Sequence, residues 1–203
     1  MLQPIRLAVT LFSGFLQKNH SEASGLLVID NQVRQLCNGR PEVRVSLNPW
    51  DSDESDIAEA LWRLRPADAV QEHIVIGYSY GGDRAVKCCR ELVKRGDVHV
   101  VTLVLIDPVV RWDWLPGVAA SFGVGSHHVP DAVGEVIHFA QSSPRWKWAH
   151  GRDLFSPAGH PVVHRGKKVP PKVCGTSHTY IDNLQTVRVA CLEVVERSLK
   201  RIP

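Results

Sequence analysis

The sequence predicts an α/β domain in which a mostly parallel central sheet is flanked by helices. Stretches of strand length alternate with stretches of helical spacing through the first half of the chain and again at its end. The expected strands are also apolar almost throughout, which is typical of parallel strands covered on both faces. A length of 203 residues suits a single domain spanning 1–203.

The first half of the chain alternates regularly between the two kinds of element. We expect strands at 5–12, 43–47, 74–78 and 98–106, and helices at 21–38, 55–65 and 83–95. Runs of leucine and β-branched residues indicate the strands, and apolar residues three or four positions apart indicate the helices. One face of the first helix, for example, collects Leu26, Ile29, Val33 and Leu36.

The pattern is looser in the second half. We expect one more strand at 133–139 and a last helix at 182–199. Two irregular segments, near 109–131 and 142–172, read as loops that contain at most one short strand. They hold Trp112, Trp114, Trp146 and Trp148, which would line a substrate pocket or a short lid. Aromatic packing that pins long loops is an equally good interpretation.

The composition argues against a nucleic-acid-binding protein, a disulfide-rich protein and a zinc ribbon. A formal net charge of +3, from scattered basic residues, does not favour a nucleic-acid partner. Five cysteines, an odd number with two adjacent and no Cys-x-x-Cys pair, argue against a disulfide framework and a zinc ribbon. Reduced thiols in a cytoplasmic protein are the simplest interpretation.

The N-terminal region has two interpretations. Residues 1–23 resemble a signal peptide in their basic and apolar pattern, which would make the protein secreted. We favour a first core strand there, and hence a cytoplasmic protein. No apolar run is long enough for a membrane helix, so we expect no stable membrane insertion.

The most informative stretch is Gly77-Tyr78-Ser79-Tyr80-Gly81-Gly82. A bare Gly-x-Ser-x-Gly occurs by chance, and an ordinary strand-to-helix turn is the alternative. Here the motif follows a β-branched apolar run and opens a predicted helix, which is the context of a nucleophile elbow. The glycines allow the tight turn, and the helix N-terminus favours negative charge beside Ser79.

Two further residues fall at the carboxyl ends of predicted strands, where parallel sheets form their sites. Asp107 ends the strand after the elbow, and His178 comes before the last helix. A serine hydroxyl needs a base within hydrogen-bond reach, and the base needs a group that orients it. Ser79, Asp107 and His178 therefore form a candidate triad.

Together with Leu105-Ile106-Asp107-Pro108-Val109 and Ser177-His178-Thr179-Tyr180-Ile181-Asp182, the elbow resembles the α/β-hydrolase superfamily of esterases, lipases and thioesterases. The resemblance covers nearly the whole chain and implies a small α/β-hydrolase fold. It implies Ser79 as nucleophile and His178 as general base. Asp107 is the favoured acid. Asp153 is the alternative, because the acid of much of the superfamily follows one strand later.

The resemblance also implies an oxyanion hole made by backbone N–H groups. The N–H of Tyr80 would supply one donor. That of Phe15, after the first strand, would supply the other, although the family's longer glycine run is absent there.

We therefore expect a serine hydrolase that cleaves a small-molecule carboxylic ester or thioester without a cofactor. An acyltransferase on the same triad and a non-catalytic binding module are the alternatives. No His-x-x-x-His or Cys/His spacing supports a metal site, since Cys174 and His178 are an isolated pair. The acyl chain, the leaving group and the oligomeric state are left open.

Overall fold

We describe the protein from a computed structural model. The structure describes residues 4–14, 25–109, 126–141, 145–147, 153–155, 161–176 and 178–202. Within these ranges, the side chains of 145–147, 153–155, 178 and 179 are outside the description.

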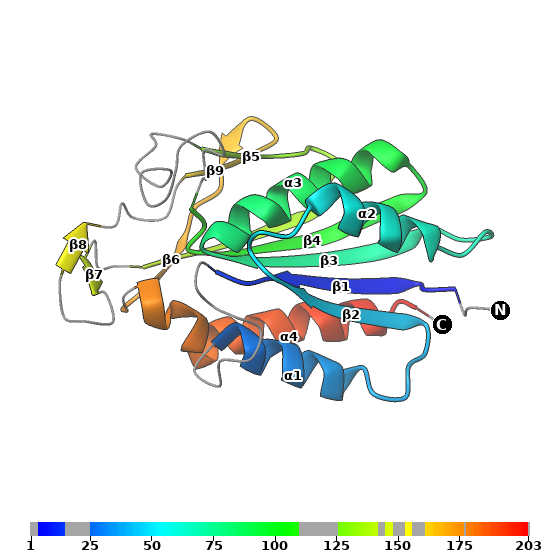
Figure 1. The fold of residues 1–203 in the computed structure, drawn as a ribbon, viewed down its shortest axis with the longest axis horizontal. Helices are drawn as coiled ribbons and strands as arrows, with labels where there is room; N and C mark the ends of the chain where they lie inside the picture. The colour runs from blue at the N-terminus through cyan, green and yellow to red at the C-terminus, as the bar shows by residue number, and fades with distance from the viewer. Residues whose placement is uncertain are drawn as a thin grey trace.

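A six-stranded parallel sheet forms the centre of the molecule (Figure 1). Its strand order is β11-β6-β4-β3-β1-β2, and every neighbouring pair is parallel. The strands are β1 (Leu7–Phe12), β2 (Val43–Asn48), β3 (Gln71–Tyr78), β4 (Val98–Ile106), β6 (Glu135–Gln141) and β11 (Lys172–Cys174). The predicted α/β class is confirmed.

Helices cover both faces of this sheet. Helices α1 (Gly25–Leu36) and α4 (Gln185–Leu199) lie on one face, and α2 (Glu54–Arg63) and α3 (Tyr80–Arg95) lie on the other (Figure 1). Helix α2 begins at Glu54, one residue before the expected 55, and the Asp53 carboxylate caps it by accepting hydrogen bonds from the N–H groups of Ser55 and Asp56.

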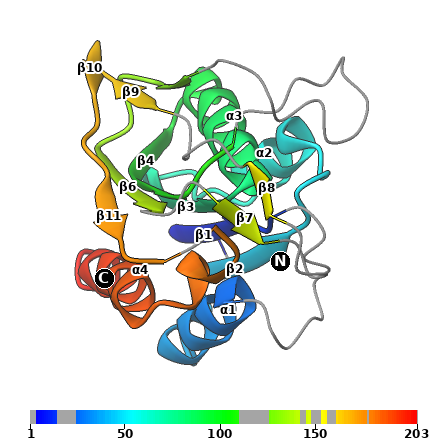
Figure 2. The ribbon, with the colours of Figure 1, turned by 90° about the vertical axis from the view of Figure 1, so that its left-hand side faces the viewer.

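The carboxyl ends of the strands carry additional short elements. Strands β7 (Arg145–Lys147) and β8 (Asp153–Phe155) pair antiparallel and lie beyond those ends (Figures 1 and 2). A small sheet of β5 (His127–Val129), β9 (Val162–His164) and β10 (Lys167–Lys168) lies beside α3. The expectation of at most one short strand in 142–172 is therefore wrong, because pairing with neighbours orders segments too short to show a period.

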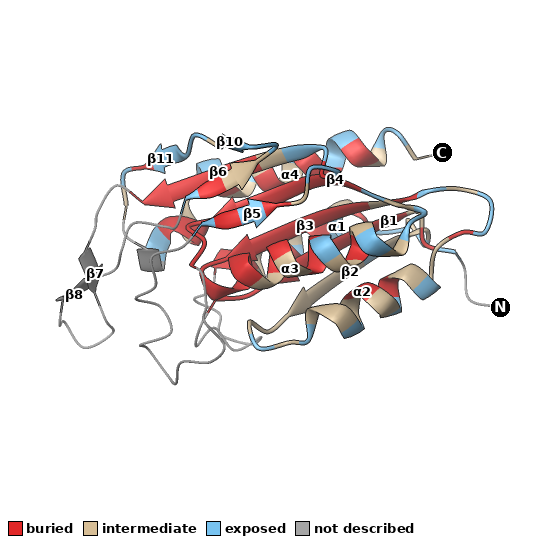
Figure 3. Ribbon diagram, turned by 90° about the horizontal axis from the view of Figure 1, so that it is seen from above, coloured by how far each residue is buried: buried red, intermediate tan, exposed pale blue. Residues whose placement is uncertain are grey.

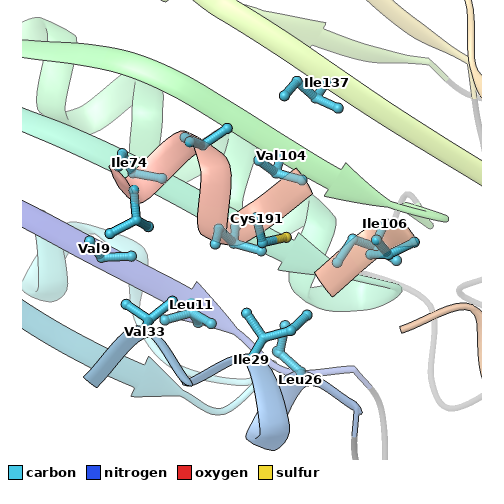
Figure 4. Packing of buried hydrophobic residues seen from close by; sticks show 14 of the residues in the cluster. Val9, Leu11, Leu26, Ile29, Val33, Ile74, Val104, Ile106, Ile137 and Cys191 are labelled. Atoms are coloured by element: carbon cyan, nitrogen blue, oxygen red, sulfur yellow. The ribbon is translucent and has the colours of Figure 1, made fainter. Parts of the chain in front are cut away.

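The core lies in two layers, one on each face of the sheet. Strands β1, β3 and β4 are almost wholly buried (Figure 3). The first layer packs α1 and α4 onto the sheet through residues such as Ile29, Cys191, Val9, Ile74 and Val104 (Figure 4). The second packs α3 onto the opposite face through Val86, Cys89 and Leu92. Alternate residues of each strand thus point to opposite layers, as the apolar strands require.

The strand order reverses at β1 and β3. From β1 the chain moves outward to β2 at one edge, and then crosses back to β3 and continues through β4 and β6 towards the other edge. Open α/β sheets bind ligands outside the carboxyl ends of the strands at such a switch point. A ligand site is therefore expected at the loops that follow β1 and β3.

Candidate functional site

Ser79 lies at the junction of β3 and α3, where the chain turns sharply. Its φ of 55° and ψ of −123° are rare for a residue other than glycine. Its N–H donates to the Ile106 carbonyl at 3.1 Å, and its carbonyl accepts from the N–H groups of Gly82 and Val109 at 2.9 Å each. Its side chain makes no capping hydrogen bond to α3. The end of β4 and the first turn of α3 therefore maintain the strained turn.

The glycines around Ser79 let the start of α3 approach the sheet. A Cβ at Gly77 would lie 2.5 Å from the Gly81 carbonyl oxygen and 2.7 Å from the Ala85 Cβ. A Cβ at Gly81 would overlap the Phe12 carbonyl oxygen at the end of β1. Larger residues at either position would push the helix away from β1 and β3.

The loop after β1 runs directly beside Ser79. A Cβ at Gly14 would lie 2.8 Å from the Tyr78 ring and 3.1 Å from the Ser79 Cβ. The loop is held on its other side, where the Ser13 N–H donates to the Asn48 carbonyl at 2.9 Å. The ends of β1, β2 and β3 therefore converge on one place.

Tyr80 is the first residue of α3, and its side chain is buried. Its ring lies against that of Trp50, with 6.1 Å between the centroids and 44° between the planes. Trp50 is not among the site residues predicted from the sequence. Its position two residues after the carboxyl end of the parallel strand β2 was the signal that it lies near the site.

Asp107 is fully buried at the carboxyl end of β4 and has a φ of 45°. Its N–H donates to the Phe139 carbonyl at 2.8 Å, and its Oδ1 accepts from the Gln141 N–H at 3.3 Å. Tyr78 and Ile106 are paired in register, so Ser79 and Asp107 follow neighbouring positions on adjacent strands. The structure thus brings these two predicted site residues to the same edge of the sheet.

Two titratable side chains at this edge of the sheet have shifted pKa values. Burial, together with the carboxylates of Asp182 and Asp107, raises the pKa of Tyr78 well above its ordinary value. Burial also lowers the pKa of His138 in β6, while the Asp107 carboxylate opposes that shift. His138 is not among the site residues predicted from the sequence, although a histidine inside an apolar strand is a signal of a buried polar position.

His178 begins a short 3₁₀-helix, η2 (His178–Asn183), which follows β11 and precedes α4. The last helix therefore starts three residues later than the expected 182. Asp182 in η2 is fully buried, and its Oδ2 accepts from the Leu26 N–H at 3.2 Å, in the first turn of α1. A Cβ at Gly25 would overlap the backbone of Asp182. Through this contact α1 holds the segment that carries His178 at the carboxyl end of the sheet.

Several predicted site residues fall outside the described part of the chain. Phe15, Trp112 and Trp114 lie outside it altogether. Trp146 in β7 and Asp153 in β8 are described only by their backbones, which pair in neighbouring positions of the two strands.

Other features of the described residues bear on the class of site. In the ranges that the structure describes, no three His, Cys, Asp or Glu side chains gather to hold a metal ion. No helix within those ranges is long and apolar enough to span a membrane. All five cysteines are buried and unpaired.

No protein-family model matches the chain, and comparison with the curated proteins finds no relative.

Proposed function

We propose that the protein is a serine hydrolase of the α/β-hydrolase type, which cleaves a carboxylic ester or thioester through an acyl-serine intermediate. The observation that carries the proposal is the strained backbone of Ser79, held between β3 and α3 at the switch point of the sheet. Backbone strain that the surroundings over-determine is found most often at functional sites. A strand–turn–helix context of this kind is that of a nucleophile elbow, and Ser79 lies in it with 4% of its surface exposed.

In the first half of the reaction, the Ser79 Oγ adds to the substrate carbonyl carbon while its proton passes to His178. The tetrahedral intermediate then collapses, and His178 returns the proton to the departing alcohol or thiol. In the second half, water adds to the acyl-serine with His178 as base. The carboxylic acid leaves and the Ser79 hydroxyl is restored.

Three other groups complete the proposed mechanism, one carboxylate and two backbone N–H groups. Asp107 would hold His178 in the correct tautomer by accepting a hydrogen bond from its ring. Two observations support this role: the buried carboxylate is positioned by the Gln141 N–H, and Asp107 lies at the same edge of the sheet as Ser79. The N–H groups of Tyr80 and Phe15 would stabilise the oxyanion. The close approach of Gly14 to Ser79 supports this, since it brings the chain before Phe15 next to the nucleophile.

The buried, unpaired thiols favour a reducing compartment, so we assign the enzyme to the cytoplasm. The acyltransferase alternative differs only in the acceptor of the acyl group. Product analysis in the presence of added alcohol would separate it from hydrolysis, because a transferase yields a new ester in place of the free acid.

The proposal is tested by intact-mass measurement after reaction with a fluorophosphonate, which phosphonylates activated serines. We expect one adduct on the wild-type protein and none on Ser79→Ala. Ser52→Ala, in a turn preceding α2, is the matched control and should label like the wild type.

Circular dichroism must show that all three proteins are folded. No adduct on a folded wild-type protein would contradict the hydrolase and favour the binding module. An adduct that persists on Ser79→Ala would show that another residue is the nucleophile.

A further inference from the structure

A cavity of about 640 Å³ lies on the outer side of α3, between this helix and the small sheet of β5, β9 and β10. Its volume is within the range of about 300–1,000 Å³ that is usual for small-molecule sites. Charged and polar side chains and an apolar wall line it, including Arg90, His128, Asp131, Arg165, Val129 and Val163. We call it the α3 groove.

Arg165 is placed in the α3 groove by an unusual hairpin turn. Arg165 and Gly166 form the two-residue connection from β9 to β10, with φ values of 52° and 71°. Such turns strongly favour Asn, Asp or Gly at their first position. The Arg165 N–H donates to the Asp131 Oδ1 at 3.1 Å, and its guanidinium donates to the Asp131 and Val133 carbonyls at 3.2 and 3.1 Å. An arginine in a strained position is thus held in place at three points.

Arg90 approaches the same groove from α3. Its Nη2 donates to the His128 carbonyl at 2.7 Å. Carbonyl oxygens therefore orient both guanidinium groups, and within the described residues neither forms an ion pair with a carboxylate. A carbonyl fixes a guanidinium without neutralising its charge.

A second cavity gives a useful contrast. It measures about 450 Å³ and is also lined by two arginines, Arg34 and Arg40. There Arg34 pairs with Asp30 at 2.8 Å and Arg40 with Glu42 at 2.7 Å. Its positive charge is compensated, whereas that of the α3 groove exceeds the single carboxylate of Asp131.

We propose that the α3 groove binds a small molecule that carries a phosphate group. Guanidinium groups present forked donors that match phosphate oxygens in a bidentate manner. The apolar wall, with a buried Val129 and a half-buried Val163, would contact the organic part of the ligand. Arg90 lies ten residues along α3 from Tyr80, or about 15 Å at the rise of an α-helix. The groove is therefore separate from the site around Ser79 and independent of its proposed chemistry.

The test is isothermal titration of the whole 203-residue chain with inorganic pyrophosphate and with glycerol 3-phosphate, near physiological salt to screen unspecific attraction. We expect saturable binding of at least one probe, and comparing the two shows whether an ester or the free ion is preferred. Arg90→Gln and Arg165→Asn should each weaken binding about tenfold or more. Asparagine suits the left-handed turn at 165, so this variant removes the guanidinium and keeps the hairpin.

Arg63→Gln is the matched control, because it removes one positive charge from an exposed position on α2. Binding by this variant should stay within about twofold of the wild type. Absence of saturable binding of both probes at millimolar concentration would overturn the proposal. Equal weakening by Arg63→Gln would also overturn it, since the attraction would then come from net charge and not from the groove.

Discussion

Asp107 combines features that are costly for an aspartate. It is fully buried, its φ is positive, and its Oδ1 accepts a hydrogen bond of 3.3 Å from the Gln141 N–H. Burial of a carboxylate is unfavourable unless the surroundings compensate for lost hydration. The proposed role of Asp107 in orienting His178 requires a carboxylate, and we infer that this requirement offsets the cost of its burial.

The role of Asp107 can be separated from that of Asp153 by parallel asparagine variants. Asp107→Asn should lower kcat about 10⁴-fold, because an amide would favour the wrong tautomer of the histidine. Asp153→Asn should stay within a few-fold of the wild type. Hydrolysis of a short acyl ester and the rate of fluorophosphonate labelling provide two readouts. A large loss for Asp153→Asn with little change for Asp107→Asn would reverse the assignment.

At the residue scale, the sequence identified residues that follow predicted strands, but it did not identify the distant residues that contact them. Ser79 and Asp107 were recognisable because each ends an apolar run. Asp182 was not recognised, because its function as acceptor for the Leu26 N–H depends on a residue 156 positions away. No local pattern reports such a contact.

At the element scale, the contact of α3 with β1 determines the geometry of the elbow. Gly81 lies where α3 crosses the end of β1, and its missing side chain is what permits the crossing. Helix α3 begins at Tyr80, three residues before the expected start, although two glycines are poor helix formers. Tertiary packing here outweighs intrinsic propensity.

Gly81→Ala should destabilise the protein, because its Cβ would overlap the Phe12 and Ser13 carbonyl oxygens. Overpacking of this kind costs about 1–3 kcal/mol in free energy of unfolding. Urea denaturation measures the change, and labelling of Ser79 should slow as the elbow moves.

Gly175→Ala is the control for this change. A Cβ at Gly175 would have no neighbour within 4 Å, and its φ is not in the left-handed region. We expect a change within about 0.5 kcal/mol. Equal stability of Gly81→Ala and the wild type would show that α3 can shift without cost.

At the scale of the whole molecule, buried histidines link stability to pH. His73 is fully buried in β3, and its Nε2 lies 2.7 Å from the Gln71 Oε1. Burial lowers the pKa of His73 from 6.5 to about 4. The unfolded chain therefore binds a proton at a higher pH than the folded protein, so stability is greatest above pH 6.5 and falls as the pH decreases towards 4.

Urea unfolding at about pH 7.5 and about pH 4.5 should reveal a loss of about 2–3 kcal/mol from His73. His73→Gln should lose less stability than the wild type between these pH values, because glutamine does not titrate. The two proteins are compared by the change in unfolding free energy between the two pH values. This is needed because burial also lowers the pKa of His138, which adds the same pH dependence to both proteins. The same pH dependence in both proteins would contradict the assignment to His73.

The sequence by itself determined the α/β class, the order of the main elements and the place of the elbow. These features depend on local periodicity and on the backbone freedom of a few glycines, which neighbouring residues alone reveal. The tertiary structure decided which loops meet. It brought Gly14 beside Ser79, and it placed Arg90 of α3 and Arg165 of a distant hairpin around the same cavity. Strand order, register and crossover arise from packing between remote segments, so a local pattern does not contain them.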